Sequence, residues 1–374
     1  MIKKQRFVIL AGFVLLVVIG SIGFIWLRQQ GLSDSMQTSR SLKVAVILNL
    51  SGPAAQFDAV KTQTVEIAQQ RLAILYPHLE LSVQLYDAAG GPQGTASAVR
   101  SARRDGARFF LSGTSPTALA IANEVRNLDP LPVQMANAAN PDFGPPRPGE
   151  YRLWPDWGQE ASVLAGLVRD QSWQRLVVVH SADPYSTALN SAFSAEIRDL
   201  ETIVVGSISF DPADAPDFRP LLLRGKAEAA EAVVVFGLPP GIRSLVAQLE
   251  EIRWDAAVVG GVNINLATND YRESGLNGGL WLIQTEAMSG AMPEGSEAAA
   301  FRKAFMAKHN ASPPFHALYI ADGLYFIGEA YKDGCGATPV ECVGRVESFE
   351  SASGRVAIGN NGILEYRMDP KRVE

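Results

Sequence analysis

The feature that most constrains this chain is a repeated alternation between short apolar runs and longer segments with helical spacing of apolar residues. Runs such as KVAVIL (residues 43–48), LVVVH (176–180) and AVVVF (232–236) are apolar at nearly every position. Strands that are apolar on both faces are typical of parallel sheets, because each face packs against a layer of helices. We therefore predict an α/β fold of the doubly wound kind.

A proline-rich stretch divides the alternation into two halves. Five prolines and three glycines lie between residues 138 and 160, after which the alternation restarts. This is expected of a chain that leaves one α/β lobe and builds a second. Two further helical segments, residues 297–308 and 315–331, then precede a hairpin-like end. The sequence therefore predicts two doubly wound α/β lobes, with a helical pair that returns to one of them.

The first 30 residues differ in composition from the rest. Three cations precede an uncharged apolar run of 21 residues at positions 7–27. As a helix this run would reach about 31 Å, enough to cross the hydrocarbon core of a bilayer. We predict that residues 1–30 form an N-terminal transmembrane anchor, with a cleavable signal peptide as the alternative, and that residues 31–41 form a linker. The cations before the run place the globular part outside the cytoplasm, as a single-pass protein of the cytoplasmic membrane.

Charge and the rarer residue types exclude several classes of protein. Lys and Arg total 33 against 39 for Asp and Glu, for a net charge of -6, so no nucleic-acid partner is predicted. The four histidines fall in no metal-ligand spacing, and we predict neither a metal nor a cofactor. Only GATPVE separates Cys335 from Cys342. Outside the cytoplasm this pair is predicted to form a disulfide, the alternative being two unrelated thiols.

Motifs that carry catalysis are missing from the sequence. It has no G-x-S-x-G, Walker A, H-E-x-x-H or C-x-x-C motif. The glycine turn at residues 90–92 lacks the G-x-G-x-x-G spacing of a nucleotide-binding loop. We predict that the protein is not an enzyme.

Four segments together indicate a known family. KVAVILNLSGPAAQFDAVKTQTVEIAQQR resembles the first strand, S-G-P loop and first helix of type I periplasmic binding proteins of the leucine/isoleucine/valine-binding kind. LSVQLYDAAGGPQGTASAVRSARRDGARFFLSGTSPTALAIANEV, VVVHSADPYSTAL and ASGRVAIGNNGILEY are similar to later parts of the same family, in the same order. The likeness spans residues 42–367. It is the order and spacing of the segments that make the resemblance specific.

The resemblance implies a fold and a mechanism. It implies two lobes joined by three crossovers, with a ligand cleft between them that closes on a small solute. We expect residues 42–155 and 286–350 in lobe 1, and residues 156–285 and 351–374 in lobe 2. The closed protein would hand its solute to an ABC permease in the membrane.

The resemblance also implies which residues line the cleft. Ser115 opens a helix, whose free N–H groups and dipole suit a carboxylate, although it is equally suited to capping the helix. Phe57 matches a position that is commonly tyrosine in the family, its alternative being a core aromatic. Tyr185 matches the tyrosine that packs on the ligand from the second lobe. The full predicted set is Ser51, Phe57, Ser115, Ala138, Ala139, Tyr185, Leu238, Val262 and Asn263.

Two positions depart from the family pattern. Ala139 stands where a threonine hydroxyl would contact an amino acid, and Val262 stands near the acidic residue that holds the ligand ammonium. Burying an ammonium without a partner costs several kcal/mol, so valine cannot take that role. Either Asp58, Asp156 or Asp183 replaces the missing acid, or the ligand is an organic acid, amide or aromatic compound. Such a ligand would pack on Phe57, Trp154, Trp157 and Tyr185, although hinge packing explains the two tryptophans equally well.

The sequence therefore favours a solute-binding protein that serves an ABC-type importer, with an amino-acid-like ligand or a carboxylate or amide relative. A ligand-sensing receptor that signals to a membrane kinase or chemoreceptor is the alternative. A ligand-free interaction domain is the third reading.

Overall fold

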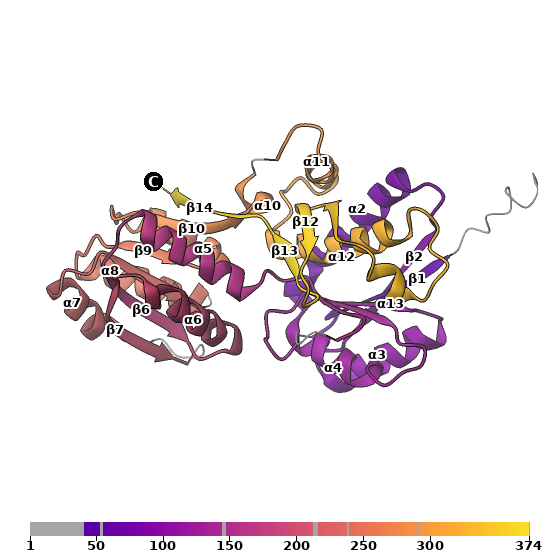
Figure 1. Ribbon diagram of the computed structural model, residues 1–374, viewed down its shortest axis with the longest axis horizontal. Coiled ribbons are helices and arrows are strands. Elements are labelled where there is room, and N and C mark those ends of the chain that lie inside the picture. Colours follow the sequence, from indigo (N-terminus) through magenta and orange to yellow (C-terminus); the bar gives the residue numbers. More distant parts are fainter. Residues whose placement is uncertain are drawn as a thin grey trace, which may run out of the picture.

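Two separate β-sheets organise the chain, each at the centre of one lobe (Figure 1). The computed structural model describes residues 41–52, 55–143, 147–211, 216–237, 239–290 and 292–373. The predicted anchor, residues 1–30, and all but the last residue of the predicted linker lie outside these ranges. Within the described ranges, no helix combines the length and the apolar character that a membrane crossing requires.

Lobe 1 is built on five parallel strands in the order β2-β1-β3-β4-β5. They are β1 (Leu42–Leu48), β2 (Leu81–Asp87), β3 (Phe109–Ser112), β4 (Val133–Ala136) and β5 (Glu150–Arg152). Helices α2 (Ala55–Leu75), α3 (Pro92–Arg104) and α4 (Ser115–Val125) each follow one of the first three strands. The central strands β3 and β4 are buried throughout, as expected of parallel strands covered on both faces, and they are apolar except for Ser112 and Gln134.

Lobe 2 repeats this plan with six strands in the order β14-β10-β9-β8-β6-β7. They are β6 (Arg175–Ser181), β7 (Ile203–Phe210), β8 (Ala232–Phe236), β9 (Ala257–Gly260), β10 (Leu280–Thr285) and β14 (Met368–Val373), of which only β14 runs antiparallel. Its helices are α5 (Trp157–Asp170), α6 (Pro184–Glu196), α7 (Arg219–Ala227), α8 (Pro239–Glu251) and α9 (Thr268–Glu273), with 3-10 turns η1 (Ile197–Asp199) and η2 (Val262–Ala267). The predicted two-lobed α/β architecture is confirmed.

The C-terminal quarter of the chain returns to lobe 1. It forms α10 (Glu286–Ser289), α11 (Glu297–His309), α12 (Phe315–Tyr331), α13 (Pro339–Val343) and a small sheet of β11 (Ser348–Ser351), β12 (Gly354–Ile358) and β13 (Leu364–Tyr366). The small sheet packs on α12 through Phe349, whose ring stacks on that of Phe326, and Arg152 of β5 bridges to Ile363. The structure thus places β12 and β13 with lobe 1 and only β14 with lobe 2, whereas residues 351–374 as a whole were expected in lobe 2. The difference arises because a hairpin with one apolar face can cover either lobe, and periodicity does not say which.

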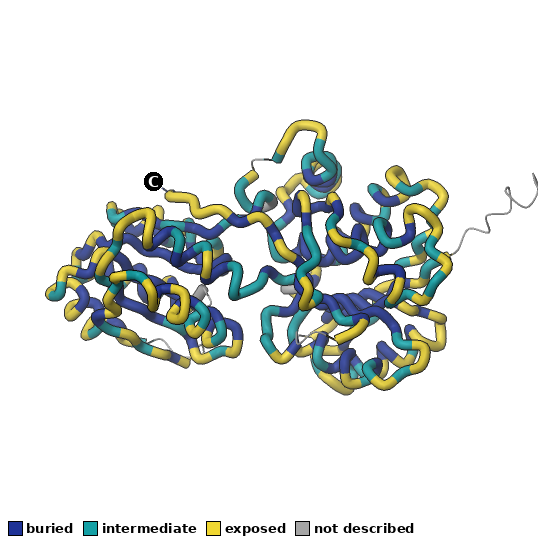
Figure 2. The backbone as a smooth tube through the Cα atoms, in the orientation of Figure 1, coloured by how far each residue is buried: buried dark blue, intermediate teal, exposed yellow. Residues whose placement is uncertain are grey.

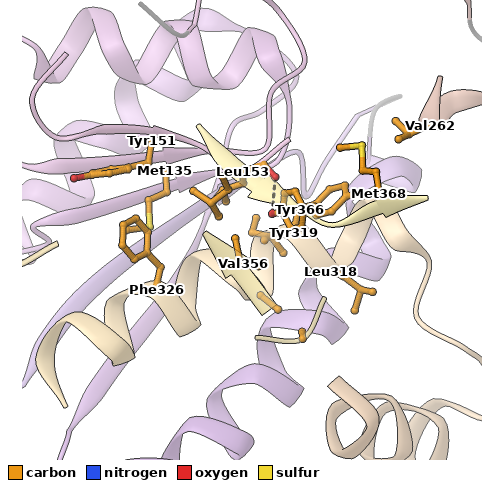
Figure 3. Packing of buried hydrophobic residues seen from close by; sticks show 14 of the residues in the cluster. Met135, Tyr151, Leu153, Val262, Leu318, Tyr319, Phe326, Val356, Tyr366 and Met368 are labelled. Atoms are coloured by element: carbon orange, nitrogen blue, oxygen red, sulfur yellow. Dashed lines mark hydrogen bonds between the residues drawn. The ribbon is translucent and has the colours of Figure 1, made fainter. Parts of the chain in front are cut away.

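The lobes meet where the chain crosses between them, after β5, after β10 and between β13 and β14 (Figure 1). One cluster of buried apolar residues continues through both lobes, and Figure 2 shows buried backbone in each. In the first crossover, the Trp154 ring contacts Tyr185 of lobe 2 as well as Phe315 and Tyr319 of lobe 1. In the third, the Tyr366 hydroxyl donates to the Leu153 carbonyl at 2.8 Å (Figure 3). The first crossover therefore contacts both lobes and is hydrogen-bonded to the third crossover.

Candidate functional site

In lobe 1, three predicted loops lie at the carboxyl ends of parallel strands, where open α/β sheets place their ligands. Ser115 is the first residue of α4, and its Oγ accepts hydrogen bonds from the backbone N–H groups of Ala139 at 3.1 Å and Asn140 at 3.2 Å. A hydroxyl that accepts two bonds still has one hydrogen to donate. Thr114, at the N-cap, makes no side-chain capping bond. The structure therefore brings Ser115 and Ala139 together and leaves a hydroxyl donor at the start of α4.

The other predicted residues of lobe 1 have different surroundings. Ser51 is exposed after β1, and its backbone N–H donates to Asp87 Oδ1 at 3.3 Å; hydrogen bonding by Ser51 lowers the pKa of that carboxyl. Ala138 is completely buried and packs in an apolar cluster with Phe143. The side chain of Phe57 lies outside what the structure describes.

A buried ion pair lies beside these loops and joins Asp58, one of the three candidate acids, to Lys61, which was not predicted. Asp58 accepts from both the backbone and the side chain of Asn49, at 2.8 and 2.9 Å. Its other oxygen lies 2.6 Å from Lys61 Nζ, which also donates to the Gly113 carbonyl at 2.6 Å. The burial of both charges explains why they are paired. Asp58 is thereby compensated within its own lobe and does not replace the missing acid near Val262.

In lobe 2, a buried carboxylate that the sequence analysis missed joins two of the predicted residues. Glu160, in the first turn of α5, is completely buried, and both its oxygens lie 2.7 Å from the Tyr185 hydroxyl. Its Oε2 also accepts from the backbone N–H of Val262 at 2.8 Å. Burial raises the pKa of Glu160 to about 7, because the loss of solvation by water outweighs the hydrogen bonds from Tyr185 and Val262 and the attraction of Arg152. The group links α5, the start of α6 and the end of β9.

Gly261 makes the close approach of this carboxylate possible. A Cβ at that position would lie 2.5 Å from Glu160 Oε2 and 2.7 Å from a methyl carbon of Leu189. One sequence signal marks Glu160: it occupies the apolar face of α5 together with Ala161, Leu164 and Val168, all buried. A carboxylate on the buried face of a helix needs a partner, so the position could have been singled out.

The two remaining acidic candidates are helix caps. Asp156 Oδ2 accepts from the backbone N–H groups of Gly158 and Gln159 at 3.1 and 3.2 Å, and Asp183 Oδ1 accepts from that of Ser186 at 3.0 Å. N-cap carboxylates are expected at helix starts and require no ligand. The tryptophans also have structural partners, since the Arg152 guanidinium lies 3.9 Å above the Trp157 ring.

Comparison with known proteins adds the family. The sequence model of the periplasmic binding protein family matches residues 41–352. The chain belongs to this family. The chain is also similar to a Leu/Ile/Val-binding protein from Rhizobium johnstonii, with 27% identity over 260 residues. That alignment covers 67% of this chain and 66% of the relative, just under two thirds of the relative's length.

Solved structures have the same fold as this periplasmic binding protein. A leucine-, isoleucine-, valine-, threonine- and alanine-binding protein from Brucella ovis superposes with a TM-score of 0.73 at 18% identity, over 89% of this chain and 95% of that one. A solute-binding protein of an ABC transporter from Rhodopseudomonas palustris, in complex with 3,4-dihydroxybenzoic acid, superposes with a TM-score of 0.69 at 18% identity, over 89% and 93% of the two chains. The family resemblance read from the sequence is confirmed, and the family is one of binding proteins and not of enzymes.

The predicted residues of this periplasmic binding protein thus fall into two groups, one at the edge of each sheet. Tyr185 and Val262 meet at Glu160, and Asn263 is buried beside Val262 with 9% of its surface exposed. Leu238 lies outside the described residues. Among the described residues, no hydrogen bond joins Ser115 or Ala139 to the lobe 2 group, so the two groups lie on separate lobes.

Two further predictions concern the cysteines and metals. Cys335 and Cys342 form a disulfide with a Cα–Cα distance of 5.9 Å, which confirms the predicted pair. In the part of the chain that the structure describes, no group of three or more His, Cys, Asp or Glu side chains could hold a metal ion.

Proposed function

We propose that this protein works outside the cytoplasm, closes its two lobes on a small organic carboxylate and delivers it to an ABC-type importer. Its membership of the periplasmic binding protein family supports the solute-binding role. A ligand held between the lobes favours the closed arrangement by its additional contacts there. The importer would recognise that arrangement.

The surroundings of Glu160 carry the choice of ligand class. Both carboxyl oxygens already have donors, from Tyr185 and from the Val262 backbone, and the side chain has no exposed surface. A ligand ammonium would have to displace the Tyr185 hydroxyl and leave it without its acceptor. Val262 offers no acid in place of Glu160. Lobe 2 is therefore better suited to a ligand without an ammonium group than to an amino acid.

Lobe 1 retains the features that suit a carboxylate. The Ser115 hydroxyl has a hydrogen to donate, and the first turn of α4 has no side-chain cap to compete for its N–H groups. Ala139 contributes no hydroxyl, which a ligand lacking an ammonium does not require. The aromatic contacts of Trp154 with Tyr185 and Phe315 provide apolar surface for an aliphatic or aromatic body.

The relatives include proteins for amino acids and a protein for a carboxylate without an ammonium group. Two of them are named as binding proteins for leucine, isoleucine and valine. Another protein of the same fold was solved in complex with 3,4-dihydroxybenzoic acid, a carboxylate without an ammonium. The same two-lobed fold therefore serves either class. Ligand class depends on the side chains at the two sheet edges.

The cellular setting is part of the proposal. We propose that residues 7–27 hold the protein at the cytoplasmic membrane with both lobes on the outer side. The disulfide between Cys335 and Cys342 supports an oxidising compartment. An anchored binding protein would remain close to its permease.

The test is thermal unfolding of the purified full chain with matched ligands. Leucine and 4-methylpentanoate share the carboxylate and the alkyl chain and differ only in the ammonium; benzoate and benzamide differ in the carboxylate. A ligand at 100 times its dissociation constant adds about 2.7 kcal/mol to the free energy of unfolding. We expect larger shifts with 4-methylpentanoate and benzoate than with leucine and benzamide, and smaller shifts in Ser115→Ala.

A larger shift with leucine, lost in Glu160→Gln, would show that Glu160 opens to bind an ammonium and would overturn the ligand class. No shift with any compound of a wider panel of amino acids, amides and organic acids would overturn solute binding itself.

A further inference from the structure

A cavity of about 760 Å³ lies between the lobes, beside the second crossover. It contains none of the residues predicted from the sequence to line the cleft, and of those assigned to the solute site above it shares only Phe315. Lobe 2 contributes β10, β14, η2 and α9, and the other wall comes from α10, α11 and the start of α12. We call it the crossover cavity. Its lining is Asn265, Leu266, Thr268, Arg272, Leu282, Gln284, Met288, Arg302, Ser312, Pro313, Phe315, Lys371, Arg372 and Val373.

The charges of this lining are all of one sign. Arg272, Arg302, Lys371 and Arg372 line the cavity, and no Asp or Glu does, although the whole chain carries a net charge of -6. Arg272, Lys371 and Arg372 make no ion pair with any described residue. The acids nearest in sequence are engaged elsewhere, since Asp270 pairs with Arg243 at 3.2 Å and Asp369 with Arg367 at 3.3 Å. Like charges gathered in a concave surface raise the local potential and attract an anion.

The remaining lining favours an anion with a carbon body. Leu282, Met288 and Phe315 give apolar contact, which an inorganic ion would not use. The Gln284 amide donates to Asn265 Oδ1 at 2.8 Å, while its own oxygen is buried without a hydrogen-bond partner among the described residues.

We propose that the crossover cavity is a second ligand site, which takes an organic anion with two or more carboxylate groups. Lobe 2 supplies three of the cations and Arg302 of α11 supplies the fourth, so one anion would contact both lobes at once. Such a ligand would bridge the two lobes and favour their approach. Because η2 runs from Val262 to Ala267 and its later residues line the cavity, occupancy would act directly on the lobe 2 edge of the predicted site.

Calorimetric titration of the full chain tests this site at constant ionic strength. The probes are citrate and benzene-1,2-dicarboxylate, with sulfate as an anion without a carbon body and benzamide as a neutral aromatic. We expect saturable binding of at least one organic probe, weaker or undetectable binding of sulfate, and none of benzamide. Arg272→Gln and Lys371→Gln should each weaken binding of the organic anion about tenfold, because each variant loses a charge-assisted hydrogen bond. Arg224→Gln, on α7 at the far end of lobe 2, removes the same charge and should leave the affinity unchanged.

Ser115→Ala distinguishes this site from the proposed solute site. The variant should reduce the thermal shift caused by 4-methylpentanoate or benzoate and leave the affinity for citrate and benzene-1,2-dicarboxylate unchanged. Equal affinity in wild type, Arg272→Gln and Lys371→Gln would overturn the proposal, as would sulfate binding as tightly as the organic anions. No binding of either organic probe would also overturn it, whatever the outcome with 4-methylpentanoate.

Discussion

Each lobe buries a carboxylate beside the sheet edge that we propose as its half of the ligand site, and the two carboxylates are stabilised differently. In lobe 1, Asp58 lies 2.6 Å from the Lys61 ammonium, so the charge is balanced by a cation. In lobe 2, Glu160 has only neutral donors, the Tyr185 hydroxyl and the Val262 N–H. Neutral donors compensate burial incompletely, and the pKa of Glu160 is accordingly raised to about 7. Lobe 1 therefore has an ion pair, whereas lobe 2 has a carboxyl group with a pKa raised to about 7.

The largest expected effect on stability comes from removing the cation of lobe 1. Lys61→Met leaves Asp58 buried without its partner, and we expect a loss of about 3–5 kcal/mol in the free energy of unfolding. Urea unfolding of the full chain measures it. The double variant Lys61→Met with Asp58→Leu removes both charges and should recover most of the loss. A single variant within about 1 kcal/mol of wild type would mean that the pair is not the main support of this edge.

The next test uses the pH dependence of lobe 2. Folding raises the pKa of Glu160 from 4.5 to about 7, so the folded state binds a proton that the unfolded state releases. The resulting stability is present below pH 4.5 and is lost as pH rises through 7. With 1.36 kcal/mol for each pKa unit, wild type should lose about 3 kcal/mol relative to Glu160→Gln between pH 4.5 and pH 8. Parallel curves for the two proteins in urea unfolding would contradict the raised pKa.

Gly261→Ala tests how closely lobe 2 encloses its carboxylate. The added Cβ would lie 2.5 Å from Glu160 Oε2, and the overpacking should cost about 1–3 kcal/mol. Thermal or urea unfolding measures the cost. The same substitution in a Glu160→Ala background meets a smaller neighbour and should cost less. An equal cost in both backgrounds would place the strain at Leu189 instead.

Ser115→Ala is the smallest of these changes. It removes the acceptor for the N–H groups of Ala139 and Asn140, which lie 3.1 and 3.2 Å from the hydroxyl, and should cost about 1–2 kcal/mol. Ser115→Thr keeps the acceptor and serves as the control for stability. If the Ser115→Ala and Ser115→Thr variants both unfold at the wild-type midpoint, the Ser115 hydroxyl does not hold the two loops together.

Several features of this protein could be read from the chain without coordinates. The alternation of buried runs and helices gives parallel sheets, and the proline-rich stretch around residues 138–160 marks the passage from one lobe to the other. Cys335 and Cys342 were paired correctly because a short loop containing glycine and proline separates them. Tyr185 and Val262 were both predicted as ligand contacts, which stays a prediction; the structure shows that both bind Glu160. All of these follow from local pattern or from family order.

Other features depended on contacts between distant segments. Asp58, Asp156 and Asp183 could not be ranked as partners for a ligand, because only the structure shows that one is paired with Lys61 and two cap helices. The sequence also did not decide whether the hairpin of β12 and β13 packs on lobe 1 or on lobe 2.

The sequence by itself therefore determined the strand and helix alternation, the two-lobed class, the disulfide and the family, since these depend on periodicity and spacing along the chain. Only the tertiary structure decided that Glu160 occupies the place next to Val262 and that four cations from α9, α11 and β14 line one cavity. Glu160 and Val262 are 102 residues apart, and Arg272 and Lys371 are 99 apart. Burial and charge at such sites depend on which segments the fold brings together, and a local pattern does not contain that information.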